Sequence, residues 1–175
     1  PSSIYYHINK LLPAHYIVFK NGDMKLRKYW DINLDGIDTE KSVAEWKDEI
    51  LYRFEESVKK HIISDVPVGV FLSGGLDSTE IVAMMRKIGL PINTFSIGLN
   101  EESFNELDYA RSTSKYYNTN HHEEILDVDD PSIILEISKN FDEPFADSSA
   151  LPVYFVSKIA SKYVKVVLSG EGGDE

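Results

Sequence analysis

The sequence contains no cysteine among its 175 residues. This absence excludes disulfide bridges, thiolate zinc sites and a cysteine nucleophile within the segment. It also fits a reducing compartment, and we expect a cytoplasmic protein.

Long hydrophobic runs are absent as well. The longest apolar stretches, such as Val68–Leu72, are far too short to span a bilayer. The first residues, Pro1–Ser3, lack both the basic and the apolar region of a secretory signal. We therefore expect no membrane partner.

Basic residues are few, because 18 lysines and arginines stand against 29 aspartates and glutamates, a formal net charge of −11. Such a surface repels the phosphates of nucleic acids, and no Lys/Arg cluster offsets this charge locally, so we expect no nucleic-acid partner. A bound nucleotide would also be repelled unless backbone dipoles and a divalent cation compensated for the field.

Hydrophobic residues make up 42% of the chain, enough for a globular core. After the first forty residues, short apolar strands alternate with amphipathic helices. This order predicts an α/β fold, a parallel sheet with helices on both faces. We expect helices over 40–63, 78–88, 104–117, 132–141 and 149–162, and strands over 68–72, 92–99, 123–128 and 164–168.

The opening of the chain predicts a different element. Residues 15–20 and 24–30 have strand character, and Asn21-Gly22 between them is typical of a hairpin turn. A lone hairpin needs a surface to pack on. We place a domain boundary after the polar stretch that follows, between residues 1–38 and 39–175.

The turn from Leu72 to Ser78 joins a buried strand to a helix, the position at which open α/β sheets bind ligands. Gly74 and Gly75 allow backbone N–H groups to approach an anion, and Ser73 and Ser78 offer hydroxyl donors. Asp77 beside bound phosphate requires a divalent cation such as Mg²⁺. The turn is neither a Walker A loop nor a dinucleotide fingerprint.

A second glycine-rich turn, Ser169–Glu175, follows the last apolar strand. Its carboxylates suit a metal better than a phosphate. If the two strands are neighbours, Asp77 and Asp174 face one Mg²⁺ from opposite sides.

Two other groups of polar residues favour a structural role. Asp142, Glu143 and Asp147 resemble metal or substrate ligands, but capping of the next helix by Asp147 or Ser148, or solvation of the loop, accounts for them more simply. His121–Glu124 looks like a zinc cluster, but neighbouring residues on a strand point to opposite faces, so these residues cannot form one compact site.

The two turns, in this order, resemble those of the asparagine synthetase family of ATP pyrophosphatases. Residues Phe95–Leu99 and Asp142–Asp147 also match that family, and Leu11–Pro13 with Tyr29-Trp30 resembles the end of its glutaminase domain. The resemblance implies a fold similar to that of the adenine nucleotide alpha hydrolases.

The resemblance also implies roles for individual residues. ATP would activate a carboxylate as an acyl-adenylate and release pyrophosphate. Mg²⁺ would be held by Asp77 and Asp174, which with Glu171 form the catalytic set; Glu171 would act on the incoming amine. The implied ATP-binding residues are Leu72, Ser73, Gly74, Gly75, Asp77, Ser78, Ile97, Ser169 and Gly170.

The expected reaction joins aspartate, or another carboxylate, to ammonia that a glutaminase domain releases from glutamine. The alternatives are an amidotransferase for a different carboxylate, in a cell-envelope or natural-product pathway, and a non-catalytic nucleotide-binding module. The glutaminase domain and the C-terminal helical part of the family are missing here. We therefore expect a truncated chain, and we expect it to be inactive alone. Its expected fold is compatible with assembly as a homodimer.

Overall fold

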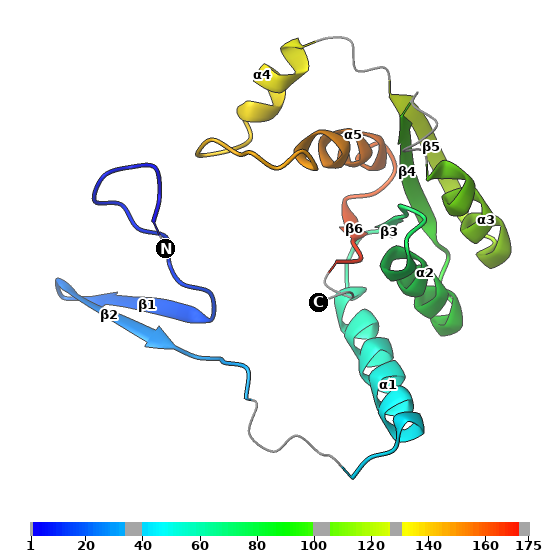
Figure 1. The fold of residues 1–175 in the computed structure, drawn as a ribbon, viewed down its shortest axis with the longest axis horizontal. Helices are drawn as coiled ribbons and strands as arrows, with labels where there is room; N and C mark the ends of the chain where they lie inside the picture. Colours follow the sequence, from blue (N-terminus) through cyan, green and yellow to red (C-terminus); the bar gives the residue numbers. More distant parts are fainter. Residues whose placement is uncertain (1, 34–39, 100–105, 127–130, 172–175) are drawn as a thin grey trace.

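A computed structural model describes residues 2–33, 40–99, 106–126 and 131–171. Four parallel strands form a sheet in the order β5-β4-β3-β6 (Figure 1). With the helices that cover both of its faces, this sheet confirms the predicted α/β fold class. The strands are β3 (Val68–Phe71), β4 (Asn93–Leu99), β5 (Asn120–Leu126) and β6 (Val166–Leu168).

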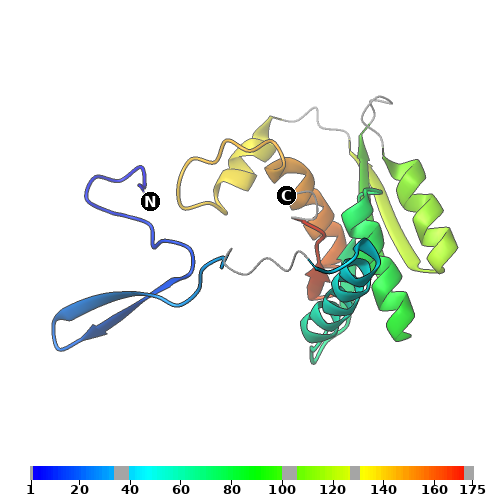
Figure 2. The same ribbon diagram turned by 60° about the horizontal axis from the view of Figure 1, so that its bottom comes forward.

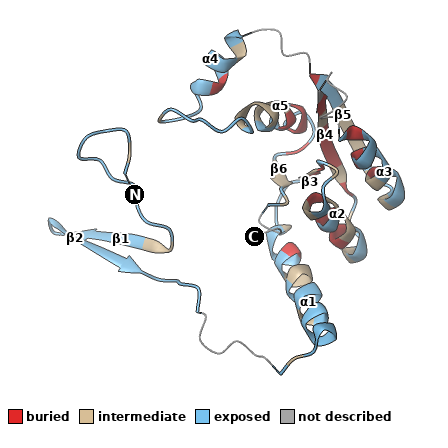
Figure 3. Cartoon of the chain, viewed as in Figure 1, coloured by how far each residue is buried: buried red, intermediate tan, exposed pale blue. Residues whose placement is uncertain are grey.

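Helices α1 (Val43–His61), α2 (Leu76–Ile88) and α3 (Leu107–Tyr117) lie on one face of the sheet. Helix α5 (Ala150–Ala160) covers the other face and contacts the short helix α4 (Ser132–Ser138). Figure 3 shows the buried positions gathered on the strands and on the sides of α2, α3 and α5 that face them.

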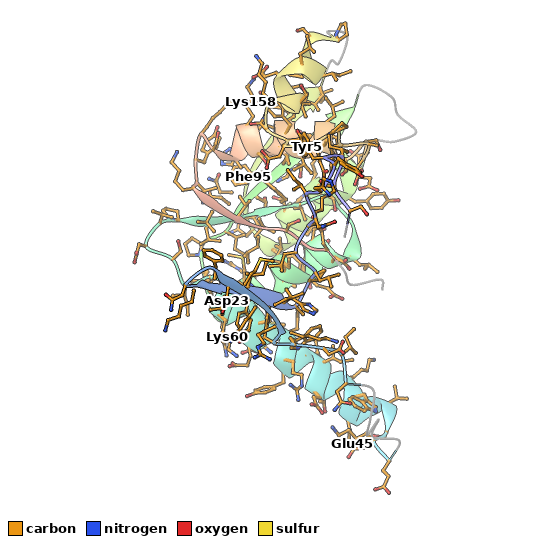
Figure 4. The ribbon with its side chains drawn as sticks, turned by 90° about the vertical axis from the view of Figure 1, so that its left-hand side faces the viewer. Tyr5, Asp23, Glu45, Lys60, Phe95 and Lys158 are labelled. Atoms are coloured by element: carbon orange, nitrogen blue, oxygen red, sulfur yellow. The ribbon has the colours of Figure 1, made fainter. Side chains whose placement is uncertain are left out.

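Alternate strand residues enter two separate cores. Val70 and Leu72 pack with Met85 on the face of α1 to α3, whereas Phe71 and Phe95 pack with residues of α5. This alternation follows from the two-residue period of a strand that is buried on both sides. Figure 4 shows Phe95 among the strands, with Asp23 and Lys60 on the surface.

Helix α1 begins with a capping box. The Ser42 hydroxyl accepts a hydrogen bond from the backbone N–H of Glu45 at 3.3 Å, and the Glu45 carboxylate accepts one from the Ser42 backbone at 2.8 Å. These bonds satisfy donors that a helix start leaves unpaired. The helix therefore begins three residues later than the pattern of apolar residues predicts.

The predicted hairpin is present as β1 (His15–Lys20) and β2 (Asp23–Lys28), an antiparallel pair. Asn21 and Gly22 both have positive φ, 53° and 86°, as a two-residue hairpin turn requires. In both Figure 1 and Figure 2 the hairpin lies apart from the four-stranded sheet. Its large apolar side chains are exposed, Phe19 by 72%.

Other predicted boundaries were wrong as well, and three of them have a local reason. Strand β5 begins at Asn120 rather than at residue 123, because its first residues are polar yet pair with β4 at the edge of the sheet. Helix α4 ends at Ser138, where the Asn140 side chain bonds two of its last carbonyls. Val164 follows the turn after α5, where its N–H donates to Ala160 O, and β6 begins two residues later.

The predicted domain boundary, between residues 38 and 39, lies within 34–39, which are outside the described residues. Among the described helices, none combines the length and the apolar character that crossing a bilayer requires.

Candidate functional site

The order of the strands defines a switch point in the sheet. From β3 the chain adds β4 and then β5 on one side, and it then returns on the opposite face to place β6 against the other side of β3. The neighbouring carboxyl ends of β3 and β6 are the place where open α/β sheets bind ligands. Both glycine-rich turns begin there, after Phe71 and after Leu168.

A closed set of hydrogen bonds shapes the first turn. The Ser73 and Ser78 hydroxyl oxygens lie 3.0 Å apart, and the Ser73 hydroxyl accepts the N–H of Gly75 at 3.2 Å. Ser78 is 4% exposed and donates its hydroxyl proton to Gly75 O at 3.2 Å. The two serines, whose hydroxyls the sequence predicts to bind phosphate, therefore lie side by side.

Gly74 takes a backbone conformation that other residues rarely adopt. Its φ is +93°, and a Cβ there would lie 2.9 Å from Tyr109 Cβ and 3.0 Å from Glu106 O. The turn thus passes against the start of α3 with no room for a side chain. Gly75 is the N-cap residue of helix α2 and makes no side-chain capping bond; the start of a helix is a favourable place for an anion.

The second turn packs directly on the start of α2. A Cβ at Gly170 would lie 2.6 Å from both Asp77 C and Ser78 N. Only glycine allows this approach of one backbone to another. On the same turn, the Ser169 hydroxyl donates to Glu171 Oε1 at 3.0 Å.

A cavity of about 340 Å³ opens where the two turns meet. A volume of this size is within the usual range for small-molecule sites. Six of the residues predicted to bind ATP line it, and Glu171 does as well. The lining residues are Phe71, Leu72, Ser73, Ser78, Phe95, Ser96, Ile97, Glu106, Pro152, Val153, Val156, Ser169, Gly170 and Glu171.

Asp77 lies on the other side of the second turn. It lines an adjoining cavity of about 570 Å³ between α1, α2 and β6, together with Glu80. Ser169, Gly170 and Glu171 line both cavities and separate them. The second predicted metal ligand, Asp174, lies outside the described residues.

The sequence reasoning missed one wall of the first cavity. Pro152, Val153 and Val156 of α5 contribute to it, as does Glu106. No local motif marks these residues, because their place depends on α5 crossing back over the sheet. Ser96 was missed too; its buried hydroxyl donates to Leu72 O.

The two histidines of β5 point to opposite faces, as predicted. His121 Nδ1 lies 2.9 Å from Thr94 Oγ1, and burial lowers the pKa of its imidazole. The His122 ring stacks on Tyr163 in the other core, with 3.8 Å between ring centroids. Within the described residues no group of three potential metal ligands comes together.

Asp147 supports the start of α5. Its carboxylate accepts the N–H of Ser149 at 2.9 Å, and this bond lowers the pKa of Asp147. Glu143 forms an ion pair with Lys10, whose hydrogen bond lowers the pKa of Glu143. Both contacts are structural, but α5 has Ser149 as its N-cap and no side-chain cap, so the predicted cap by Asp147 or Ser148 is not formed.

Residues 49–175 match the family described as asparagine synthase. The glutamine-hydrolysing asparagine synthetase 1 of Bacillus subtilis is 37% identical over 179 residues, which cover 100% of this chain and 28% of that protein. A putative asparagine synthetase 2 of Methanocaldococcus jannaschii is 40% identical over 181 residues, covering 100% and 34%.

Among solved structures, the NMN synthetase of Francisella tularensis superimposes with a TM-score of 0.45 at 17% identity, over 73% of this chain and 54% of that one. The chain spans about a third of the length of the curated relatives named above. The family match covers most of the chain and establishes that the chain belongs to the asparagine synthase family.

Proposed function

We propose that this chain binds ATP at the meeting of the two glycine-rich turns and uses it to adenylate a carboxylate, the side chain of aspartate. Ammonia derived from glutamine then converts the adenylate to asparagine. One observation carries the proposal: Gly170 rests on the backbone of Asp77 and Ser78, so both turns border one cavity.

The phosphates lie in the first turn. When the phosphates bind, the Ser73 and Ser78 hydroxyls and the Gly75 N–H exchange the hydrogen bonds they make with one another for bonds to phosphate oxygens. The N–H groups of Gly74 and of the start of α2 point to the same anion. The nucleoside lies toward Leu72 and Ile97, with Ser169 and Gly170 touching it. The absence of a side-chain cap on α2 supports this assignment.

Asp77 and Asp174 are the residues that would hold Mg²⁺. A carboxylate within the first turn of a phosphate-binding helix fits this ion, which takes one or two carboxylates together with phosphate oxygens. When bound, the ion supplies positive charge that offsets the negative charge on the phosphates.

The reaction then proceeds in two steps. An oxygen of the aspartate carboxylate attacks the α-phosphorus of ATP, and the bond to pyrophosphate breaks. The nitrogen of ammonia next attacks the acyl carbon, and AMP leaves as the C–O bond breaks. Glu171 takes the proton that the nitrogen loses, onto its carboxylate.

The relatives support the choice of substrates. Proteins similar to this chain over its whole length are named glutamine-hydrolysing asparagine synthetases. The chain covers only part of those proteins. We therefore propose, from these relatives, that the substrates are aspartate and glutamine and that the complete reaction is asparagine synthesis.

The test measures exchange of labelled pyrophosphate into ATP by the protein at its natural length. We expect exchange that requires aspartate and Mg²⁺, and Asp77→Asn to lower it by at least about 100-fold because charge stabilisation is lost. The matched control is Asp48→Asn, on the exposed side of α1. The proposal is contradicted if a carboxylate other than aspartate is required for exchange. It is also contradicted if Asp77→Asn leaves the rate of exchange unchanged.

The same assay separates the two steps. Glu171→Gln should retain exchange and lose formation of asparagine, because it removes only the proton acceptor of the second step. Loss of exchange in that variant would instead assign Glu171 to adenylation.

A further inference from the structure

We propose that Ser96 is a positioning residue for the first glycine-rich turn. Its hydroxyl decides where the pairing of β3 with β4 stops, and therefore where the turn begins. The inference rests on the proposed ATP site and deepens it. It assigns a role to a residue of β4, which acts on the turn through the backbone of Leu72.

The backbone of Leu72 is held from β4 on both of its polar groups. Ser96 is 4% exposed, and its hydroxyl donates to Leu72 O. The Leu72 N–H donates to Phe95 O at 2.9 Å. Leu72 is itself 1% exposed, so neither of its backbone groups can turn to water instead.

The bond from Ser96 replaces the next backbone bond of the sheet. The pairing of β3 with β4 ends at Phe71 and Phe95. In a parallel sheet, continued pairing in this register would give the Leu72 carbonyl the N–H of Ile97. The Ser96 side chain satisfies that carbonyl, so the chain can leave the sheet after Leu72 without a buried, unpaired acceptor.

The turn forms its own bonds from the next residue onward. The Ser73 N–H donates to Ser78 Oγ at 3.3 Å, and the Ser73 hydroxyl lies 3.0 Å from the same oxygen. These bonds require the chain to turn away from β4 directly after Leu72. Ser96 and Leu72 line the first cavity together with both serines, so the anchor and the turn that it places border one site.

Loss of the Ser96 hydroxyl should change which conformation of the turn is favoured. A buried carbonyl without a partner shifts an equilibrium by roughly 5-fold to 150-fold. The Leu72 carbonyl would then turn to the Ile97 N–H, and Ser73 would follow it toward β4. A ligand must reverse this change before it binds, so every ligand held by the turn loses affinity by the same factor.

The experiment compares Ser96→Ala with the parent protein at its natural length, in calorimetric titrations with Mg²⁺–ATP and with Mg²⁺–tripolyphosphate. Tripolyphosphate carries the phosphates without the nucleoside. Ser96→Ala should weaken the binding of both ligands at least about 10-fold and by the same factor. Ser96→Thr keeps the hydroxyl on a residue that suits a strand, and both ligands should bind it within about 3-fold of the parent.

Ser114→Ala is the matched control. Ser114 is also a buried serine, 7% exposed, and its hydroxyl accepts a hydrogen bond from Thr119 at 2.8 Å in the last turn of α3. Thermal unfolding followed by circular dichroism should show a loss of stability in both alanine variants, whereas Ser114→Ala should keep both affinities. A purely structural role of Ser96 would give Ser96→Ala the same result as this control.

A further variant keeps the test valid if Ser96→Ala fails to fold. Ser96→Cys nearly keeps the volume of the side chain but has only a weak S–H donor. It should also weaken both ligands by one common factor.

Four outcomes overturn the inference. Unchanged affinity for both ligands in Ser96→Ala shows that the turn does not depend on Ser96, and leaves the proposed function in place. Weaker binding of ATP alone makes Ser96 a direct contact of the nucleoside. Equal weakening by Ser96→Thr and Ser96→Ala shows that the hydroxyl is not the cause. Failure of the parent to bind either ligand overturns the ATP site itself, and the inference with it.

Discussion

Gly170 is the residue at which the two glycine-rich turns meet. A side chain there would lie within 2.6 Å of backbone atoms of Asp77 and Ser78, and backbone, unlike the end of a flexible side chain, cannot move aside cheaply. The contact thus ties the geometry of the second turn to the start of α2.

Gly170→Ala should displace one turn from the other. We expect ATP affinity to fall at least about 10-fold and the free energy of unfolding to fall by roughly 1–3 kcal/mol, as for other overpacked sites. Calorimetry and urea unfolding measure the two effects.

Gly89→Ala is the control for stability. Gly89 has open space around it but a φ of +86°, so the substitution should cost roughly 1 kcal/mol of stability and leave ATP affinity unchanged. If Gly170→Ala behaves in the same way as Gly89→Ala, the contact between the turns has no role in binding.

At the scale of elements, Glu55 joins two helices. Its carboxylate on α1 contacts Lys59 on the same helix at 2.8 Å and Lys87 on α2 at 2.6 Å. Hydrogen bonds from these lysines lower the pKa of Glu55 from 4.5 to about 2. Because the folded protein favours the charged form, this contribution to stability is complete above the unfolded pKa and disappears as the pH falls toward about 2.

Glu55→Gln should therefore destabilise the protein at about pH 6 and make little difference near pH 2. Urea unfolding at several pH values, followed by circular dichroism, gives the difference between variant and parent. The control Glu56→Gln removes a carboxylate that contacts Lys59 within α1, and its effect should be smaller. A destabilisation by Glu55→Gln that is equal at both ends of the pH range would refute the expectation.

At the scale of the whole molecule, the N-terminal segment contacts the loop that leads into α5. The Tyr5 hydroxyl donates to Asp142 O at 3.2 Å, and Lys10 pairs with Glu143. A cavity of about 660 Å³ lies between these elements and α4, lined in part by the stacked rings of Phe141 and Phe145.

Lys10→Glu should loosen this contact, because it places two carboxylates together. Hydrogen exchange followed by mass spectrometry should show a few-fold faster exchange in peptides covering residues 139–149, the modest size expected of a surface ion pair. Adding Glu143→Lys should restore the slower exchange, and Lys20→Glu on the hairpin should leave it unchanged. Fast exchange that the double variant does not reverse would mean that the ion pair is not the cause.

Much of the fold was predictable because its signals are local. Gly74 and Gly75 mark the first turn, Asn21-Gly22 marks the hairpin, and the alternation of apolar strands and amphipathic helices identifies a parallel sheet. Element ends were less predictable. They depended on single side chains, such as the amide of Asn140, or on polar residues that pair at an edge, such as His121 and His122.

The sequence by itself determined which turns are candidates for the chemistry, because glycine, serine and aspartate at this spacing after a buried strand are typical of a turn that binds phosphate and a metal ion. Only the tertiary structure decided that β6 lies beside β3, that Gly170 touches the start of α2, that Asp77 faces a second cavity, and that α5 provides an apolar wall. These facts depend on strand order and helix crossing. They bring together residues that are far apart along the chain, and no local pattern encodes such contacts.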